Sequence, residues 1–318
     1  MTHLPLFWFV VNRVLQFVPT MFGAVTLTFF FIHLIPGDPI ENLLGEDALA
    51  ADRQALRESL GLDKPIFEQF TTYLSDLLHG DLGTSLYSAR PVTELILERL
   101  PATAELALAA LFFAVIISFP VGIWAAVNKG KAPDKIAMTG SLLGFSMPNF
   151  WLGPLLIIMF SVWVGIFPVS GREDGIMSLI LPSITLGTGM AAVLSRLVRS
   201  SLLEVLSADY IRTARAKGVS NRRLVWRHAL RNALLPVVTV LFLQVGTLLT
   251  GAIITEAVFS WPGLGSLMIG ALNTRDYMVV QGCVLFIAIT YLTMTLLADI
   301  LYALIDPRIR FDGGKAHG

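Results

Sequence analysis

The chain has 318 residues, of which 55% are hydrophobic and 14% charged, and its 23 basic residues balance its 23 acidic residues. Soluble globular chains carry roughly 25% charged residues, so this composition, with several apolar runs of about 20 residues, indicates a membrane protein. It excludes a disordered chain, a coiled coil and a small disulfide scaffold, and the zero net charge argues against nucleic-acid binding through a basic surface.

Six apolar segments are long enough to cross a hydrocarbon core about 30 Å thick at 1.5 Å per residue. In chain order they are Val14–Ile35, Ala102–Val127, Ile136–Phe160, Ile176–Val198, Leu234–Val258 and Val279–Leu301. The first is too long for the apolar core of a cleaved signal peptide, so we expect it to remain as an anchor. The sequence therefore predicts an all-α polytopic membrane protein with six transmembrane helices.

The connection between the first two spans, residues 36–101, is long and acidic, with 12 acidic and five basic residues. Helical periodicity over Ala51–Leu60 and Ile66–Leu78, with Gly61 and Pro65 between them, predicts two short helices. This extracytoplasmic element is either a cover on the membrane face or a docking surface for a soluble partner.

The third predicted span contains Pro148, which removes a backbone hydrogen bond and therefore predicts a kink. The neighbouring polar residues Ser146 and Asn149 can satisfy the freed backbone groups. Together with Met147, they are also candidates for lining a solvated passage through the protein.

Three carboxylates lie within spans or at their ends, where a charge at the bilayer centre costs at least about 2.5 kcal/mol. Membrane interfaces are the favoured positions for Glu105 and Glu256. We expect Asp299 to pair with an arginine such as Arg196 or Arg199. Glu256 is also the first candidate for recognising a substrate ammonium group along a pathway.

Residues 200–235 connect the fourth and fifth spans and read as two helices. An apolar stripe at helical spacing runs to Ala214, Gly218 supplies the left-handed position that ends the first helix, and Ser220 can cap the second. The sequence thus predicts a helix-turn-helix on the inner side of the membrane.

The second of these helices begins with Arg222 and Arg223, where the helix dipole favours acidic residues. This arrangement suggests that an anionic group outside the chain faces the turn, either lipid headgroups or an acidic partner surface. The alternative is that both are ordinary basic residues of an inner loop.

The fifth span and the loop after it carry small and turn-forming residues. Gly246 and Thr250, and likewise Gly251 and Thr255, lie four residues apart, as close helix packing at a subunit interface requires. Beyond them, Trp261 is typical of an interfacial anchor, and the Pro-Gly pair at 262 and 263 suits a type II turn. We expect a short outer loop, with a gate over a pathway as the alternative.

The distribution of basic residues sets the orientation. With the N-terminus inside, 16 of the 23 Lys and Arg residues lie on the inner side. Inner loops of membrane proteins are enriched in Lys and Arg, so both termini are predicted to be cytoplasmic.

Six short motifs occur at different places along the chain. They are Ile35–Pro39, His79–Gly83, Asp209–Gly218, His228–Pro236, Phe259–Gly265 and Asp306–Arg310. With the six spans, they resemble the membrane subunits of ATP-driven, binding-protein-dependent (ABC) importers, and more narrowly the first permease subunit of the dipeptide/oligopeptide/nickel group, which has a type I permease fold. Against the general family motif, Arg212 stands where Glu is usual, and His228 and Arg231 also depart.

The resemblance implies a division into an N-terminal helix with an acidic outer segment (1–95), a permease domain (96–304) and a cytoplasmic tail (305–318). It also implies that residues 200–235 form a coupling loop, which docks into a groove on an ATPase subunit and transmits its closure to the spans. The expected coupling residues are Asp209, Tyr210, Arg212, Ala214, Arg215, Lys217, Gly218, Arg222 and Arg223.

The implied partners are a second permease subunit in a heterodimer, two ATPase subunits that use ATP and Mg²⁺, an extracytoplasmic substrate-binding protein and the lipid of a bacterial cytoplasmic membrane. This chain lacks a phosphate-binding loop, a metal-ligand spacing and a nucleophile motif, so we expect a transport subunit and not an enzyme, without a cofactor or metal of its own.

The expected function is import of short peptides by alternating access, with glutathione-like peptides or chelated nickel as alternative substrates. One rival is a proton-coupled carrier that uses Glu105, Glu256 and Asp299 as a relay; its uptake would persist without ATP. A second rival is a receptor whose outer segment, residues 36–101, binds a ligand. Co-purification with ATPase subunits separates these hypotheses.

Overall fold

The computed structural model describes residues 4–34, 40, 44, 49–59 and 61–305. Across these residues the secondary structure is helical, apart from one isolated bridge between Thr84 and Pro91. The predicted all-α class is therefore confirmed.

Five helices of the described chain are long and apolar enough to cross a membrane. They belong to α1 (Leu4–Leu34), α5 (Val92–Val127), α8 (Ile176–Ser207), α11 (Leu230–Val258) and α13 (Tyr277–Ile305). Each overlaps one of the predicted spans.

The remaining predicted span, the third in chain order, is divided into two helices. α6 (Ala132–Ser146) ends just before Pro148, and α7 (Asn149–Leu156) continues into the π-helix η1 (Ile157–Trp163). The two halves are bent by 105°. The expected kink at Pro148 is thus a complete break, because proline restricts the residue before it to an extended conformation, and Met147 has φ −84° and ψ 116°.

The chain forms two compact units, each made of segments that are separated in the sequence. The described parts of Met1–Phe17, Ala104–Trp261 and Tyr291–Gly318 form one unit, and Val18–Thr103 with Pro262–Thr290 forms the other. The predicted domain boundaries after residues 95 and 304 stay predictions.

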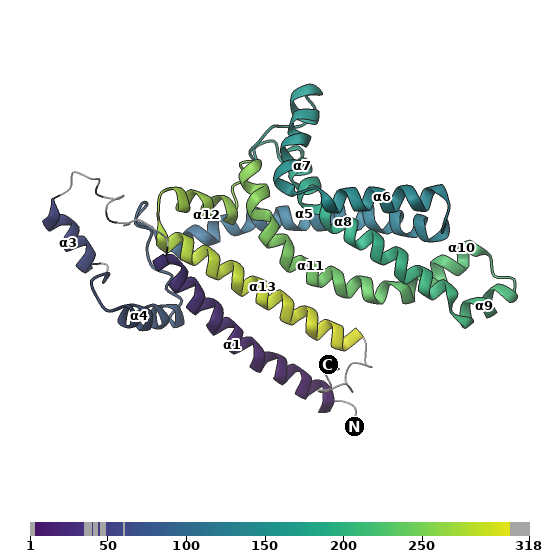
Figure 1. Ribbon diagram of the computed structural model, residues 1–318, viewed down its shortest axis with the longest axis horizontal. Helices are drawn as coiled ribbons and strands as arrows, with labels where there is room; N and C mark the ends of the chain where they lie inside the picture. Colours follow the sequence, from purple (N-terminus) through teal and green to yellow (C-terminus); the bar gives the residue numbers. More distant parts are fainter. Residues whose placement is uncertain (1–3, 35–39, 41–43, 45–48, 60, 306–318) are drawn as a thin grey trace. The chain divides into compact units, whose positions relative to one another are not determined.

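In the first unit, α8 packs against both α6 and α11 (Figure 1). It also lies against α5 so closely that glycine is required on both helices. A Cβ at Gly187 of α8 would lie 2.6 Å from the carbonyl oxygen of Ala110, and a Cβ at Gly122 of α5 would lie 2.7 Å from that of Ser195. The middle and the C-terminal half of α8 are therefore held in a dense helix bundle.

Gly246 of α11 packs closely within the chain. A Cβ at Gly246 would lie 3.0 Å from Cδ2 of Tyr291 on α13. Close packing at this glycine is as expected, and the subunit interface expected for this helix stays a prediction. The side chains of Thr250 and Gly251 lie outside the described residues.

The second unit contains the two short helices expected in the acidic segment, α3 (Ala50–Ser59) and α4 (Ile66–Leu78). Phe70 and Tyr73 of α4 pack on Phe29 of α1, with ring centroids 5.1 and 5.5 Å apart. Burial raises the pKa of the Tyr73 hydroxyl. Aromatic packing therefore ties α4 to the first span.

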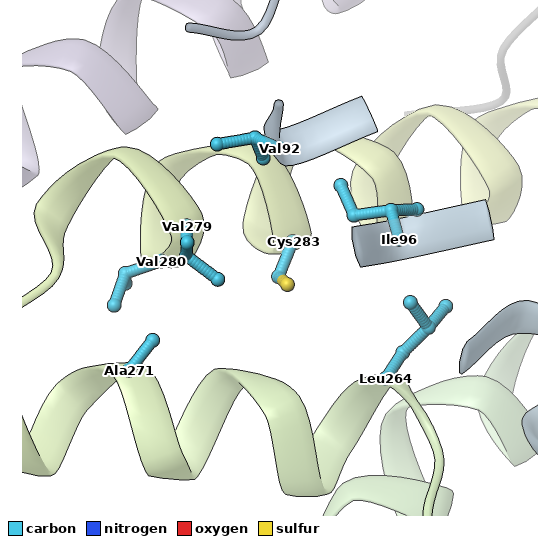
Figure 2. Packing of buried hydrophobic residues seen from close by; sticks show 7 residues of the cluster. All are labelled: Val92, Ile96, Leu264, Ala271, Val279, Val280 and Cys283. Atoms are coloured by element: carbon cyan, nitrogen blue, oxygen red, sulfur yellow. The ribbon is translucent and has the colours of Figure 1, made fainter. Parts of the chain in front are cut away.

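A further helix of this unit, α12 (Leu264–Asn273), stands where the sequence suggested only a short loop. Figure 2 shows Leu264 and Ala271 of α12 pointing toward α13, with Cys283 between them. The other members of this buried cluster are Val92, Ile96, Val279 and Val280. The ten residues of α12 are apolar but too few to span a membrane, so they pack as a core helix.

The turn before α12 corrects two expectations. Gly263 has φ −105° and ψ −169°, which is extended and not the position of a type II turn; the left-handed residue is Ser260, with φ 48°. Trp261 is fully buried instead of lying at an interface. The guanidinium of Arg172 lies over its ring at 5.7 Å. The motifs at residues 35–39 and 306–310 lie outside the described residues.

Candidate functional site

The segment between α8 and α11 folds as the predicted helix-turn-helix. α8 ends at Ser207, and a single extended residue, Ala208 (φ −68°, ψ 149°), leads into α9 (Asp209–Ala216). After the turn, α10 (Asn221–Arg223) continues through the π-helix η2 (Leu224–Ala229) into α11. α9 and α10 lie at the end of the α8–α11 pair (Figure 1).

The turn itself has the conformation that the sequence indicates. Gly218 has φ +83°, a left-handed conformation that costs other residues about 1–2 kcal/mol. Ser220 occupies the N-cap position of α10, although its side chain makes no capping hydrogen bond in the described structure. The N-terminal turn of α10 is therefore left with Arg222 and Arg223 and without the expected cap.

Apolar side chains anchor the helix-turn-helix to the bundle. Ile211 of α9 and Leu224, Val225 and Ala229 of η2 are all buried. Both α9 and η2 contact α8. Full burial of a large aliphatic side chain contributes roughly 1.5–3 kcal/mol, so these residues join the loop firmly to α8.

The opposite face of the helix-turn-helix is exposed and basic. Its exposed cations are Arg212, Arg215, Lys217, Arg222, Arg223 and Arg227. Arg212 has an ion pair with Asp209 at 3.4 Å, but both side chains are more than three-quarters exposed, and such pairs contribute little. The face therefore presents positive charge that an anionic surface can neutralise.

A shallow hollow of about 590 Å³ lies on this basic face. Its lining residues are Ser220, Arg222, Arg223, Trp226 and Arg227. The indole of Trp226 is 59% exposed. An exposed tryptophan beside arginines is the composition typical of residues that dominate binding at protein interfaces.

The structure places eight of the nine predicted coupling residues on the exposed surface, and Ala214 is half-buried. The sequence reasoning missed Trp226 and Arg227, which follow Arg222 and Arg223 by four residues. Helical spacing indicates both residues, because positions i and i+4 share one face of a helix. It also missed the hydrogen bond that Asn232 donates to the Tyr210 hydroxyl at 2.9 Å.

The four candidate pathway residues do not share one exposed surface. Ser146 is exposed at the end of α6, and its hydroxyl donates to the Leu142 carbonyl at 2.9 Å. Met147 and Asn149 are half-buried at the break before α7. Glu256, by contrast, is completely buried in α11. Their role in a pathway stays a prediction.

The acidic residues of the spans have partners that differ in part from those expected. Asp299 pairs with Arg13 at 3.3 Å. The prediction of Arg196 or Arg199 as its partner is wrong, because Arg199 binds Asp134 and the guanidinium of Arg196 lies 4.9 Å from the Phe145 ring. Glu105 pairs with Arg172, and both side chains are about two-fifths exposed.

These features define a class of protein: a multi-pass membrane protein, with a helix-turn-helix that offers a basic face at the end of its helix bundle. Among solved structures, the inward-facing MetNI methionine ABC transporter matches with a TM-score of 0.56 and 22% identity, over 67% of this chain and 96% of that one. An amino acid ABC transporter matches with a TM-score of 0.53 and 17% identity, over 68% and 94%. The fold is therefore that of type I ABC importer permeases.

Sequence comparison identifies the family. The profile described as the binding-protein-dependent transport system inner membrane component matches residues 118–311, and the profile of its N-terminal part matches residues 6–107. The chain belongs to this family, as the motifs suggested. It is accordingly an inner-membrane transport subunit of an ABC importer.

Curated relatives cover nearly the whole chain. The dipeptide transport system permease protein of Escherichia coli strain K12 is 47% identical over 95% of this chain and 98% of its own length. The di/tripeptide permease of Pseudomonas aeruginosa strain UCBPP-PA14 is 46% identical over the same shares. The glutathione transport system permease of Escherichia coli strain CFT073 is 45% identical over 95% and 99%.

Proposed function

We propose that this chain is a permease subunit of an ATP-driven importer of short peptides. The observation that carries the proposal is the anchored helix-turn-helix with its basic face, in a chain 46–47% identical to dipeptide and di/tripeptide permeases over nearly its full length. A second permease subunit completes the translocation pathway. Two ATPase subunits consume ATP and Mg²⁺, and an extracytoplasmic binding protein delivers the substrate.

The helix-turn-helix is the contact with an ATPase subunit. Two arginines in the first turn of α10 oppose the helix dipole, at a cost of roughly 0.3–1 kcal/mol each when exposed. Acidic side chains on the ATPase remove this cost and form charge-assisted hydrogen bonds, while Trp226 supplies an apolar contact. Because Ile211 and Leu224 are buried against the bundle, a push on this face moves α8 instead of only bending a loop.

The proposed orientation places both termini and the helix-turn-helix in the cytoplasm. It follows from the excess of Lys and Arg in the segments on that side, including the run from Arg196 to Arg231. The acidic segment with α3 and α4 then faces the side from which the binding protein delivers substrate.

The test uses the importer reconstituted in vesicles from this chain, the second permease subunit, the ATPase subunits and the binding protein. Replacement of Arg222 and Arg223 by Glu should lower uptake more than tenfold, because two charge-assisted contacts of about 1.5–3 kcal/mol each are reversed. Membrane insertion should be unchanged. The matched control replaces Arg57 and Arg99, two exposed cations outside the helix-turn-helix, by Glu.

Normal ATP-dependent uptake by the Arg222→Glu, Arg223→Glu variant would refute the role of the turn. Uptake that continues without ATP and stops when the proton gradient is removed would refute the ABC mechanism in favour of a carrier. The same vesicles separate the two substrate classes, since the relatives include a glutathione permease. We expect tritiated dialanine to be imported faster than tritiated glutathione.

A further inference from the structure

A nearly buried ion pair joins α6 to the part of α8 that leads into the helix-turn-helix. Arg199 Nε donates to Oδ1 of Asp134 at 2.5 Å, and Arg199 Nη2 donates to Oδ2 at 2.8 Å. The Asp134 side chain is 6% exposed and that of Arg199 is 26% exposed. Two parallel hydrogen bonds between a guanidinium and a carboxylate fix the relative orientation of the two side chains as well as the distance between them.

The same carboxylate also holds the connection between α5 and α6. The Gly130 N–H donates to Oδ2 of Asp134 at 2.9 Å, and Gly130 has φ +78°, which closes the turn. Asp134 lies in the first turn of α6, where the helix dipole favours an acidic side chain. One side chain therefore fixes three elements: the α5–α6 turn, the start of α6 and α8.

Beyond this pair, small residues form the contact between α6 and α8. Ala137 and Ser141 of α6 are buried. A Cβ at Gly144 would lie 3.2 Å from Cγ2 of Thr188. Small residues allow close approach but also sliding, because they specify no single register. The ion pair fixes the position of α6 along α8 at one end of this contact.

Arg199 lies eight residues before the end of α8, which corresponds to about 12 Å along the helix. It therefore stands between the helix-turn-helix and the membrane-embedded part of α8. A buried ion pair contributes little net stability relative to apolar packing, whereas it can specify one arrangement over others. Its position and chemistry suit the transfer of a movement from α8 to α5 and α6.

We propose that Asp134 and Arg199 are positioning residues for transport: they lock α6 and the α5–α6 turn to α8, so that these elements move as one body when the ATPases displace the helix-turn-helix. The proposal rests on the function proposed above. It assigns the pair a role in coupling ATP hydrolysis to movement of the pathway.

The first test measures substrate imported per ATP hydrolysed in the reconstituted importer. Arg199→Gln and Asp134→Asn should lower this ratio about five- to tenfold, near the lower end of the range for energetic coupling between sites. Arg199→Lys, which keeps the charge but loses the paired geometry, should give an intermediate ratio. The exchanged pair, Asp134→Arg with Arg199→Asp, should recover part of the loss, though without the Gly130 hydrogen bond.

The matched control is Arg90→Gln, which removes ion pairs with Glu94 and Glu98 whose side chains are about half exposed. The ratio of substrate to ATP in this variant should equal that of the wild type. The thermal stability of each complex is measured in parallel. If the ratio follows stability alone, or the exchanged pair recovers nothing, the pair is structural and the proposal is wrong.

The second test measures movement directly. Spin labels are placed at the exposed positions Lys135 and Ser200 by substitution with cysteine, in a Cys283→Ala background. In the complex with wild-type Asp134 and Arg199, the distance between labels should be the same with and without bound ATP. In the Arg199→Gln variant the distribution of distances between the labels should broaden, both with and without bound ATP. A distance that changes between nucleotide states despite the intact pair would overturn the proposal.

The outcomes for the two proposals are distinguishable. If the wild-type complex imports neither tritiated dialanine nor tritiated glutathione with ATP, the proposed function fails, whatever the variants show. If the wild type imports a probe and Arg199→Gln keeps the full ratio, the proposed function stands and the positioning role is refuted.

Discussion

Two glycines of α8 lie two residues apart in opposite surroundings and allow a controlled prediction. A Cβ at Gly187 would lie 2.6 Å from the Ala110 carbonyl oxygen and 2.9 Å from Cδ1 of Phe113, whereas no described heavy atom lies within 4 Å of a Cβ at Gly189. Alanine at 187 must therefore separate α5 from α8, while alanine at 189 meets open space.

The magnitude follows from the nature of the obstacle. The Ala110 carbonyl belongs to a helix backbone and cannot rotate away, so overpacking at Gly187 should cost about 1–3 kcal/mol. Both substitutions gain the same helix propensity, about 1 kcal/mol for Gly→Ala. The difference in the free energy of unfolding between Gly187→Ala and Gly189→Ala therefore isolates the steric cost, and we expect Gly187→Ala to be less stable by about 1–3 kcal/mol.

Thermal unfolding in detergent measures this difference. Cys283 is the single cysteine and is fully buried, so a thiol-reactive fluorescent dye labels it as the protein unfolds. Gly187→Ala should melt below the wild type, and Gly189→Ala should melt at or above it. Equal melting temperatures for the two variants, or a lower one for Gly189→Ala, would refute the close approach of α5 and α8.

Two further predictions concern other turns of the chain. Gly218→Ala should destabilise the helix-turn-helix by about 1–2 kcal/mol through strain alone, since no described atom would contact its Cβ; Gly218→Asn should recover part of the loss, and urea unfolding of the solubilised chain checks both. Asp276→Ala removes the carboxylate that accepts from Ser85 Oγ at 2.5 Å and from the N–H groups of Leu86 and Tyr87 at 3.3 and 3.4 Å. The buried Ser85 hydroxyl, left without its acceptor, should cost about 1–3 kcal/mol. Proteolysis within residues 84–90 should become faster, and unchanged cleavage would contradict the role of Asp276.

Features that depend on local chain pattern were predictable from the sequence. The bounds of α4 agree with the predicted Ile66–Leu78, and Gly218 adopts the left-handed conformation expected of it. Helical periodicity, apolar length and glycine at a helix end act over a few residues, so one sequence suffices to read them. The exposure of Arg212 and Arg215 followed from the same helical periodicity, but the predicted apolar stripe through Tyr210 and Ala214 is wrong in part, because Ile211 is the buried residue of α9 and Tyr210 is exposed.

Features that depend on contacts between distant segments were not predictable. Asp134 and Arg199 are 65 residues apart, and nothing in the local pattern of either selects the other; Asp299 was accordingly given the wrong arginine. α12 was missed because its ten residues include Gly265 and Gly270, which are unfavourable inside a helix, and its burial depends on packing against α13. The burial of Trp261 likewise depends on Arg172 and the surrounding bundle.

The two connections of α9 differ in how much motion they can absorb. Ala208 alone separates α9 from α8, whereas Lys217, Gly218, Val219 and Ser220 separate it from α10. Each residue offers two soft backbone torsions, so the upstream joint has two and the downstream joint has eight. A displacement of α9 is therefore passed on to α8 directly through the backbone. α11 receives it through side-chain contacts instead, including the hydrogen bond from Asn232 to Tyr210 and its packing on α8. In mechanical terms, α9 is hinged stiffly to α8 by the chain and held to α11 by packing.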